Sequence, residues 1–318
     1  MPNYALLVLL TIFILPIQKT RGENMSKVLE FSKKKVAIVS FPTDGGRLTD
    51  STINSFTEQL TSTGMPIEFT NYGWLFSDDP EKLVERFSVD KPDIVFLPDD
   101  LIYKKIAPIV EKKLPDTMVL FTAFYLKKEA THLVRKQIGV HCDAPIEHLI
   151  KQANKFSKIK SIGIVGGPFS TEILDTVTSK LKKIDVTFEH KLTNRWSEYT
   201  ETVFSFAKKY DAVWAFPPFG VKSDDNSSIG NHQFNSLLKE IDKPSLGYGG
   251  LNGIVRTMHM DIDPVDVGRN AASMAFKYFR GENVGVQEFT SYGIRISDEH
   301  LKRLKLSVPS ELLGFITM

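Results

Sequence analysis

The residues His141-Cys142-Asp143 bring a thiol, an imidazole and a carboxylate into one short segment. A cysteine becomes a nucleophile when a neighbouring histidine takes its proton, so these residue types suggest covalent catalysis. Adjacent residues of a strand point to opposite faces, however, which separates the thiol from the imidazole. The sequence also contains no Gly-x-Ser-x-Gly elbow of the acyl-transfer type. We therefore expect no catalytic residue and no enzyme; contact of His141 or Asp143 with a ligand near a hinge is the alternative.

The segment Met258-His259-Met260 raises the question of soft-metal binding, because thioethers and imidazole suit copper. On a strand the two methionines lie on one face and the histidine on the other, which divides the proposed ligand set. We expect the methionines to pack in the core and His259 to face outward. The single cysteine, Cys142, excludes a cysteine-rich zinc or iron–sulfur site. We therefore predict no metal site and no cofactor.

Two pairs of carboxylates and two pairs of glycines are the remaining clusters. Asp99-Asp100 and Asp224-Asp225 are read as solvated turn residues, since paired acid and base roles need facing positions. Gly45-Gly46 and Gly166-Gly167 follow predicted strands, but neither fits a dinucleotide-binding or phosphate-binding loop. A bound nucleotide is therefore not expected.

These clusters must be positioned by an alternation of short apolar strands and amphipathic helices. The first unit has a strand at residues 35–41, a Pro/Gly turn at 42–46, and a helix with Ile53, Phe56 and Leu60 on one stripe. The same alternation continues along the chain, and it is typical of parallel βαβ units with helices on both sheet faces. The predicted fold class is α/β.

The second helix has a clear start in the sequence. Asp79 can cap it, Pro80 suits the first helical position, and Leu83, Val84 and Phe87 form an apolar face.

Several segments recur in the same order in the second half of the chain. The matching pairs are 33–41 with 158–166, 91–100 with 209–218, and 114–123 with 241–250. A repeat of this length is too long for a solenoid. We infer two Rossmann-like lobes with parallel sheets.

The residues after the second copy are too few for a third lobe and must complete the other two. We predict a crossing at residues 249–253, a helix at 265–279 and one strand at 288–296 that crosses again. Three crossings would make a multi-strand hinge. The predicted division is residues 34–141 plus 249–286 for lobe 1, and 142–248 plus 287–318 for lobe 2.

Residues 4–15 form a continuous apolar run, which suits a signal-peptide core and is too short for a membrane span. Thr20 and Gly22 are small residues placed for cleavage after Gly22, although no Lys or Arg precedes the run. We predict a signal peptide at residues 1–22 and a secreted, periplasmic protein. An uncleaved membrane anchor is the alternative.

The composition of the chain excludes several classes of protein. The chain has 318 residues, of which 42% are hydrophobic and 25% charged, with a formal net charge of +2. This excludes a disordered or collagen-like chain, and the charge is too small and too scattered for a nucleic-acid partner. Two lobes of this class bind ligands beyond the carboxyl ends of their strands, where loops meet helix N-termini.

The loops at those strand ends carry polar residues and several aromatic side chains that can stack on a flat or apolar ligand. Packing under their own loops is the alternative for each aromatic residue. The candidate ligand-binding residues are Thr43, Trp74, Asp99, Thr122, Phe124, Phe169, Ser170, Pro217, Phe219 and Tyr248.

The tail, DIDPVDVGRNAASMAFKYFRGENVG followed by YGIRISDEHLKRLKLSVPSELL, resembles the ABC-transporter substrate-binding family of the type 1 periplasmic-binding-protein fold. Residues 166–170 resemble that family's Asn-Pro-x-x-x-Ser loop, but the Asn is missing here. Residues 217–223 and 122–124 stand where the family often has Thr-Asp-Asn and Thr-Asp-Pro. These departures argue against its usual amino-acid-like ligand.

The resemblance implies a small organic solute held between hinged lobes and presented to an ABC permease in the inner membrane. A receptor component of a sensory pathway is the alternative, and an α/β enzyme is a weaker one. A transcriptional regulator would need a helix-turn-helix headpiece, for which the short segment before the first strand leaves no room.

Overall fold

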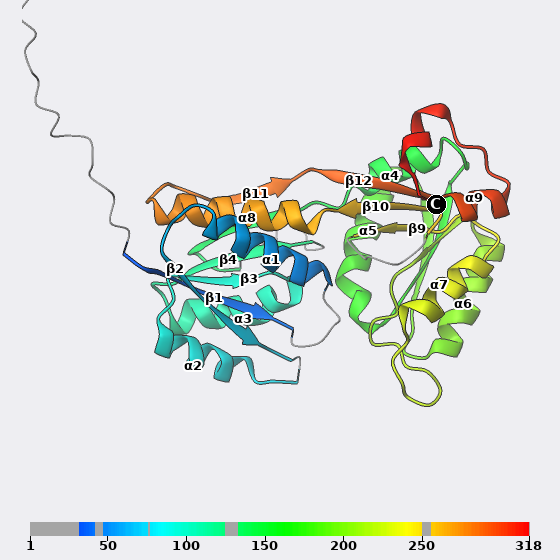
Figure 1. Ribbon diagram of the computed structural model, residues 1–318. Coiled ribbons are helices and arrows are strands. Elements are labelled where there is room, and N and C mark those ends of the chain that lie inside the picture. Colours follow the sequence, from blue (N-terminus) through cyan, green and yellow to red (C-terminus); the bar gives the residue numbers. More distant parts are fainter. Residues whose placement is uncertain (1–31, 42–46, 76, 125–132, 250–255, 318) are drawn as a thin grey trace, which may run out of the picture. The chain divides into compact units, whose positions relative to one another are not determined.

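Two lobes, each built on parallel strands, make up the part of the chain that the computed structural model describes (Figure 1). The described residues are 32–41, 47–75, 77–124, 133–249 and 256–317. Lys33–Met318 forms one compact unit. The predicted α/β class with two lobes of parallel sheet is confirmed.

The first lobe contains a six-stranded parallel sheet in the order β11-β5-β4-β3-β1-β2. Its strands are β1 (Lys34–Ser40), β2 (Ile67–Gly73), β3 (Ile94–Leu97), β4 (Met118–Ala123), β5 (Gln137–Cys142) and β11 (Val286–Phe289). Helices α1 (Arg47–Thr61) and α8 (Pro264–Phe279) cover one face, and α2 (Pro80–Asp90) and α3 (Asp100–Lys113) cover the other (Figure 1).

The second lobe joins a parallel sheet to a mixed one. The parallel sheet has the order β7-β6-β8, with β6 (Ser161–Gly166), β7 (Thr187–Leu192) and β8 (Ala212–Ala215). A bridge from Val213 to Ser245 connects it to the sheet β13-β12-β10-β9. The strands of that sheet are β9 (Leu246–Tyr248), β10 (Met258–Ile262), β12 (Tyr292–Ser297) and β13 (Ile316–Thr317).

Five α-helices and a longer 3-10 helix accompany these strands in the described part of the second lobe, together with a one-turn 3-10 helix. They are α4 (Ile146–Ala153), α5 (Thr171–Lys183), α6 (Trp196–Lys209), α7 (Asn231–Glu240), α9 (Asp298–Leu304) and the 3-10 helix η3 (Ser310–Phe315). The one-turn helix η2 (Pro168–Ser170) precedes α5. Within the described ranges, no helix is both long enough and apolar enough to cross a membrane.

The helix ends and apolar faces predicted from the sequence are present in the structure. The Asp79 side chain accepts a hydrogen bond from the Glu81 N–H, which caps α2, and Leu83, Val84 and Phe87 are buried. Gly64 adopts a φ of 73° after α1, the left-handed conformation that glycine takes without steric cost.

One predicted strand is wrong in its continuity. The segment expected as a single strand at 288–296 is divided, since β11 ends at Phe289 and β12 begins at Tyr292. β11 pairs parallel to β5 in the first lobe, whereas β12 pairs antiparallel to β10 in the second. The interruption lets one segment change sheets. The residue boundaries proposed for the two lobes stay a prediction.

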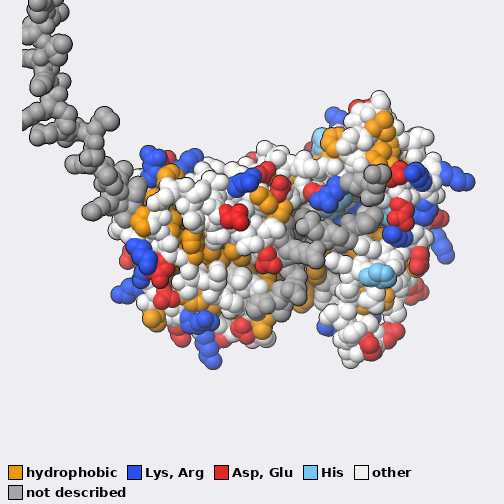
Figure 2. Space-filling view, viewed as in Figure 1, with side chains coloured by type: hydrophobic (Ala, Val, Ile, Leu, Met, Phe, Trp, Pro, Cys, Tyr) orange, Lys and Arg blue, Asp and Glu red, His pale blue; other side chains and the backbone are white. Residues whose placement is uncertain are grey.

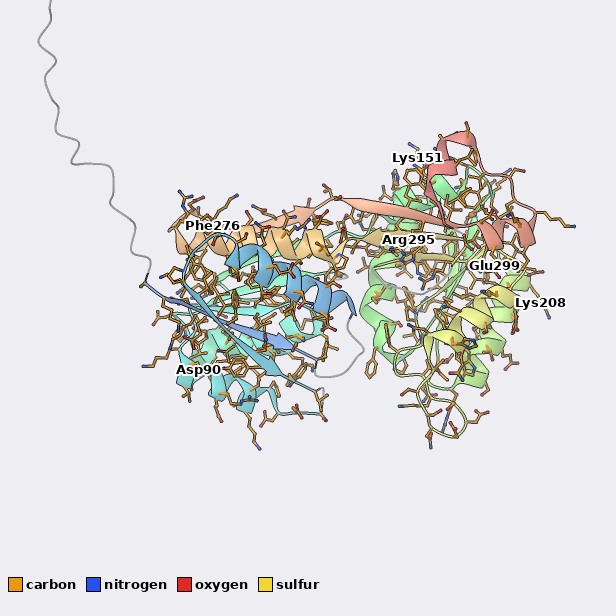
Figure 3. All side chains as sticks on the ribbon, in the orientation of Figure 1. Asp90, Lys151, Lys208, Phe276, Arg295 and Glu299 are labelled. Atoms are coloured by element: carbon orange, nitrogen blue, oxygen red, sulfur yellow. The ribbon has the colours of Figure 1, made fainter. Side chains whose placement is uncertain are left out.

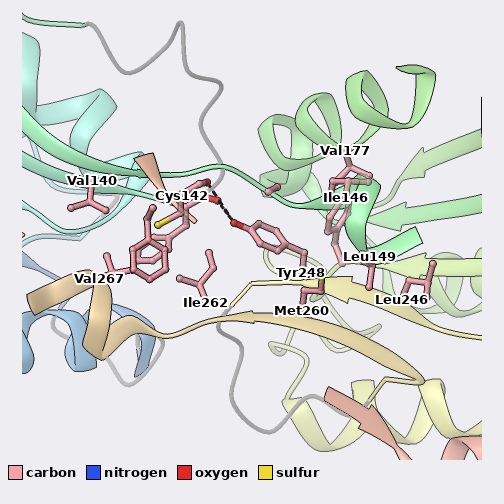
Figure 4. Close-up of a cluster of buried hydrophobic side chains, with 14 of the residues drawn as sticks. Val140, Cys142, Ile146, Leu149, Val177, Leu246, Tyr248, Met260, Ile262 and Val267 are labelled. Atoms are coloured by element: carbon pink, nitrogen blue, oxygen red, sulfur yellow. Dashed lines mark hydrogen bonds between the residues drawn. The ribbon is translucent and has the colours of Figure 1, made fainter. Parts of the chain in front are cut away.

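A single cluster of buried side chains runs through both lobes. It includes Val36 and Phe56 of the first lobe, and Ile162 and Trp214 of the second. Between them lie residues of the connecting segments: Val140, Cys142, Tyr248, Met260, Ile262 and Val267 (Figure 4). The segments that join the lobes therefore each pack at least one face in apolar surroundings.

Candidate ligand-binding site

Two phenylalanine side chains stand exposed at the carboxyl ends of neighbouring parallel strands in the second lobe. Phe169 follows β6 and is 65% exposed, and Phe219 follows β8 and is 48% exposed. Apolar side chains of this size usually lie in the core of a folded protein, and an exposed apolar patch often marks a binding surface. These rings are the strongest local indication of a ligand site.

Glycines allow the two loops that carry these rings to lie against each other. A methyl group at Gly167 would lie 2.3 Å from the Phe219 carbonyl oxygen, so no larger residue fits there without moving backbone. Gly220 has a φ of 79°, and a methyl group on it would lie 2.8 Å from the Phe169 ring. Each ring's loop is therefore held by the other.

Ser170 and Pro217 shape these loops from inside. Ser170 is 1% exposed, and its N–H donates to the Gly167 carbonyl oxygen at 3.0 Å. The carbonyl oxygen of Pro217, which is also buried, accepts from the Phe219 N–H at 2.7 Å. Of the four candidates in this lobe's two loops, only Phe169 and Phe219 present their side chains at the surface.

In the first lobe, Trp74 packs beneath its loop. It is 2% exposed, its indole N–H donates to the Asp78 carbonyl oxygen at 3.3 Å, and its ring centroid lies 6.1 Å from that of Phe41. Leu75, the next residue, is 41% exposed. The sequence indicates that an aromatic residue ends this strand but does not show whether the loop covers it.

The carboxylates of Asp99 and Asp100 are not the solvated pair that the sequence suggested. Asp99 caps α3, because its Oδ1 accepts from the Leu101 N–H at 2.8 Å. Asp100 is 8% exposed, and its carboxylate oxygens lie 3.0 and 3.2 Å from the Phe124 nitrogen. Both carboxylates are occupied by backbone N–H groups, which is how burial of a charge becomes tolerable.

Tyr248 reaches from the second lobe to two strand ends of the first. Its hydroxyl lies 3.3 Å from the Phe124 carbonyl oxygen and 3.5 Å from that of Cys142 (Figure 4). Tyr248 is 5% exposed and Phe124 is 1% exposed. Thr122 is fully buried, and its Oγ1 has no hydrogen-bond partner among the described residues. Thr43 lies outside the described residues.

Cys142 and His141 occupy different sides of β5. Cys142 belongs to the same core cluster as Val140, whereas His141 is in register with Ala123, which packs in the cluster on the α2 and α3 side. Burial raises the pKa of the Cys142 thiol well above its ordinary value, which disfavours the thiolate.

The prediction that His259 faces outward is wrong. Met258 and Met260 pack in the core as expected, but His259 is only 4% exposed and lies in a group of charged side chains with Arg256 and Asp261. Strand alternation places His259 on the opposite face from the methionines without showing that this face is also covered. Polar residues recur at every second position from Thr257 to Asp261, but this pattern also fits a solvent-exposed face and so did not reveal the burial of His259.

Charged side chains on the visible surface show no region of one sign. Acidic and basic residues are interspersed over the face in Figure 2. Within the described residues, no cluster of three or more His, Cys, Asp or Glu side chains has the arrangement of a metal site.

Comparison with known proteins gives structural similarity but no sequence match. No protein-family model matches the chain, and no curated protein does. An ABC domain in complex with L-Trp from Streptococcus pneumoniae superposes with a TM-score of 0.65 at 16% identity, covering 90% of this chain and 100% of its own. A ligand-free, open substrate-binding protein with adhesive properties from Clostridium difficile gives 0.66 at 18% identity, covering 89% and 98%. The chain has the type 1 periplasmic-binding-protein fold.

Repressors share the type 1 periplasmic-binding-protein fold. A dimeric Lac repressor superposes with a TM-score of 0.53 at 11% identity, covering 83% of this chain and 97% of its own. Structural neighbours of this chain are therefore substrate-binding proteins of ABC transporters and repressors of the Lac type. The fold alone does not identify the ligand, which must be inferred from the residues of this chain.

Proposed function

We propose that this protein is an exported solute-binding protein that holds a small organic molecule between its two lobes and presents it to an ABC permease. The observation that carries the proposal is the exposure of Phe169 and Phe219 on interlocked loops at the carboxyl ends of β6 and β8. In open α/β sheets this is the edge at which ligands bind. The structural neighbour that holds L-Trp supports a small-molecule ligand.

The surroundings of the two rings suit binding rather than chemical conversion. Gly166, Gly167 and Pro168 precede Phe169, and Phe216, Pro217 and Pro218 precede Phe219. The hydroxyl-bearing neighbour of Phe169, Ser170, is 1% exposed and does not present its side chain beside the ring at the surface. Aromatic rings stack on flat groups and cover apolar ones. We therefore propose a ligand that has a planar or apolar part and that is released without chemical change.

Binding would be coupled to closure of the lobes. A ligand that contacts both lobes favours the conformation in which both contacts are made. Leu75, which is 41% exposed just after β2 in the first lobe, would supply part of the opposing surface.

A thermal-shift screen with exposed-ring variants tests the proposal. The library contains amino acids, sugars, nucleobases, vitamins and aromatic acids, and a ligand at 100 times its Kd adds about 2.7 kcal/mol of stability. Phe169→Ala and Phe219→Ala should each reduce the shift given by the best compound. Phe315→Ala is the matched control, because Phe315 is 41% exposed but lies in η3.

Two results would overturn the proposal. One is a library without any stabilising compound. The other is a compound whose shift is equal in the parent protein and in both ring variants. Chemical conversion of the compound during incubation would indicate an enzyme instead.

Export is tested separately. The proposed signal peptide at residues 1–22 predicts that the mature, secreted chain begins at Glu23, as read by N-terminal sequencing. A chain that keeps these residues and sediments with membranes would indicate an uncleaved anchor.

A further inference from the structure

Strand β10 carries buried charged groups on the face opposite its methionines. Arg256, just before the strand, is 3% exposed, and His259 and Asp261 within it are 4% and 9% exposed. Arg295 of the neighbouring strand β12 completes the group with a half-exposed side chain (Figure 3). We call these four residues the β10 charge network.

The contacts of His259 fix which of its nitrogens carries the proton. Its Nδ1 lies 3.1 Å from an Nη1 nitrogen of Arg256, and a guanidinium group can only donate. Nδ1 therefore accepts, so in the neutral ring the proton is on Nε2. Nε2 faces the Gly249 carbonyl oxygen and, at 2.9 Å, the Oδ1 of Asp261, which are both acceptors.

The network links the ligand loop to the strands that lead to the first lobe. Arg256 donates through Nη2 to the Ala215 carbonyl oxygen at 3.0 Å, at the end of β8 and just before the loop that carries Phe219. At the other end, the second oxygen of Asp261 binds the Arg295 guanidinium on β12. β10 runs on into α8 of the first lobe, and β12 follows directly from β11.

We propose that His259 is a positioning residue that couples the loop after β8 to strands β10 and β12, and that its protonation breaks this coupling. The inference rests on the proposed function, since it assigns regulation to the same binding site. A protonated ring has no acceptor at Nδ1, so it cannot receive the hydrogen bond from Arg256. It also places a second cation beside a buried guanidinium.

The charged and titratable groups around His259 determine the pH range in which its ring is protonated. Arg256 and Asp261 face the ring, Arg295 approaches through Asp261, and from α6 the Tyr199 hydroxyl donates to the Phe216 carbonyl oxygen on the same side as Arg256. Burial lowers the pKa of His259 below its ordinary value; Asp261 opposes this shift and the Arg256 charge adds to it. The coupling is therefore intact at neutral pH and lost on acidification.

Distance measurement between spin labels on the two lobes tests the proposal without any ligand. Lys208→Cys on α6 (Figure 3) and Val89→Cys on α2 supply exposed labelling sites. The native Cys142 is 1% exposed. In the parent, the distance distribution should be narrow at about pH 7.5 and broad at the acidic end of a titration that extends well below pH 6.5, because the pKa of His259 is lowered from that value. His259→Gln should lose this pH response, while the control Arg269→Gln, which breaks only a surface pair with Asp266, keeps it.

The outcomes of this experiment distinguish a pH-dependent coupling through His259 from a purely structural role of that residue. A parent without a pH response, or a His259→Gln variant that keeps the parental response, overturns the proposal. If His259→Gln does not fold, Arg295→Gln carries the test, because its side chain is half exposed. That variant should give a broad distribution at both pH values, and an unchanged narrow one also overturns the proposal. Because no ligand is added, failure of the ligand screen leaves this result interpretable.

Discussion

The carboxylate of Asp100 accepts the N–H of Phe124, with oxygen-to-nitrogen distances of 3.0 and 3.2 Å. This bond ties the first turn of α3 to the end of β4, at the edge of the first lobe where ligands are expected to bind. Phe124 in turn offers its carbonyl oxygen to the hydroxyl of Tyr248 from the second lobe. A buried carboxylate therefore positions one of the residues through which the two lobes contact each other.

Asp100→Ala should lower the free energy of unfolding by about 1–3 kcal/mol, because it leaves the buried Phe124 N–H without its acceptor. Asp100→Asn keeps an acceptor oxygen and should cost less. Urea denaturation of the two variants measures the difference. Equal costs would show that Phe124 finds another acceptor.

The aromatic candidates should separate into two classes on substitution. Trp74→Ala opens a cavity beneath its loop and should cost about 3–5 kcal/mol, since the indole is buried. Phe169→Ala and Phe219→Ala remove exposed rings and should change stability by about 0.5 kcal/mol or less. Thermal and urea unfolding without ligand give these values. A large loss in either phenylalanine variant would mean that its ring supports the fold instead of a ligand.

Gly167→Ala should push the two ring-bearing loops of the second lobe apart. The added methyl group would lie 2.3 Å from the Phe219 carbonyl oxygen, and overpacking of this kind costs about 1–3 kcal/mol. The control is Gly285→Ala, where a methyl group meets nothing within 4 Å and the expected change is within about 1 kcal/mol. Comparable stability of both variants in urea would contradict the interlocked loops.

Acid should destabilise the protein through His300 as well as through His259. Burial, assisted by the Arg303 charge, lowers the pKa of His300 from 6.5 to about 4. The unfolded chain therefore binds a proton that the folded chain excludes, so stability is full above pH 6.5 and falls as the pH drops towards 4. The loss amounts to up to about 3 kcal/mol for this residue.

Urea unfolding at about pH 7 and about pH 4.5 measures this loss. His300→Gln should reduce the difference between the two pH values. His148→Gln, at an exposed histidine on α4, is the control and should leave it unchanged. An equal pH dependence in all three proteins would refute the role of His300.

The sequence contains enough local information to predict the two lobes and the helix ends. Asp79 caps the N-terminus of α2 and Pro80 suits its first turn, so the residue types alone predict where this helix begins. The recurrence of strand segments predicts the second lobe without knowledge of any contact. Burial of His259 and Trp74 was not predictable in the same way, because alternation assigns a side chain to a face but does not reveal what covers that face.

The break between β11 and β12 gave no signal either. Phe289, Thr290, Ser291 and Tyr292 include no Pro or Gly, and β-branched and aromatic residues favour a continuous strand. Pairing decides the outcome, since Phe289 belongs beside Cys142 in one sheet and Tyr292 beside Ile262 in the other. The predicted ligand contacts of the buried candidates stay predictions until a bound molecule is identified.

The passage of one segment from β11 into β12 also has a consequence during synthesis. β5 receives its neighbour β11 only after residue 289 has left the ribosome, and β10 receives its neighbour β12 only after residue 297 has done so. Until then each growing sheet has an open edge that can pair with a foreign strand. The β5 edge of the nascent chain is therefore open to such pairing from the synthesis of residue 142 until that of residue 289.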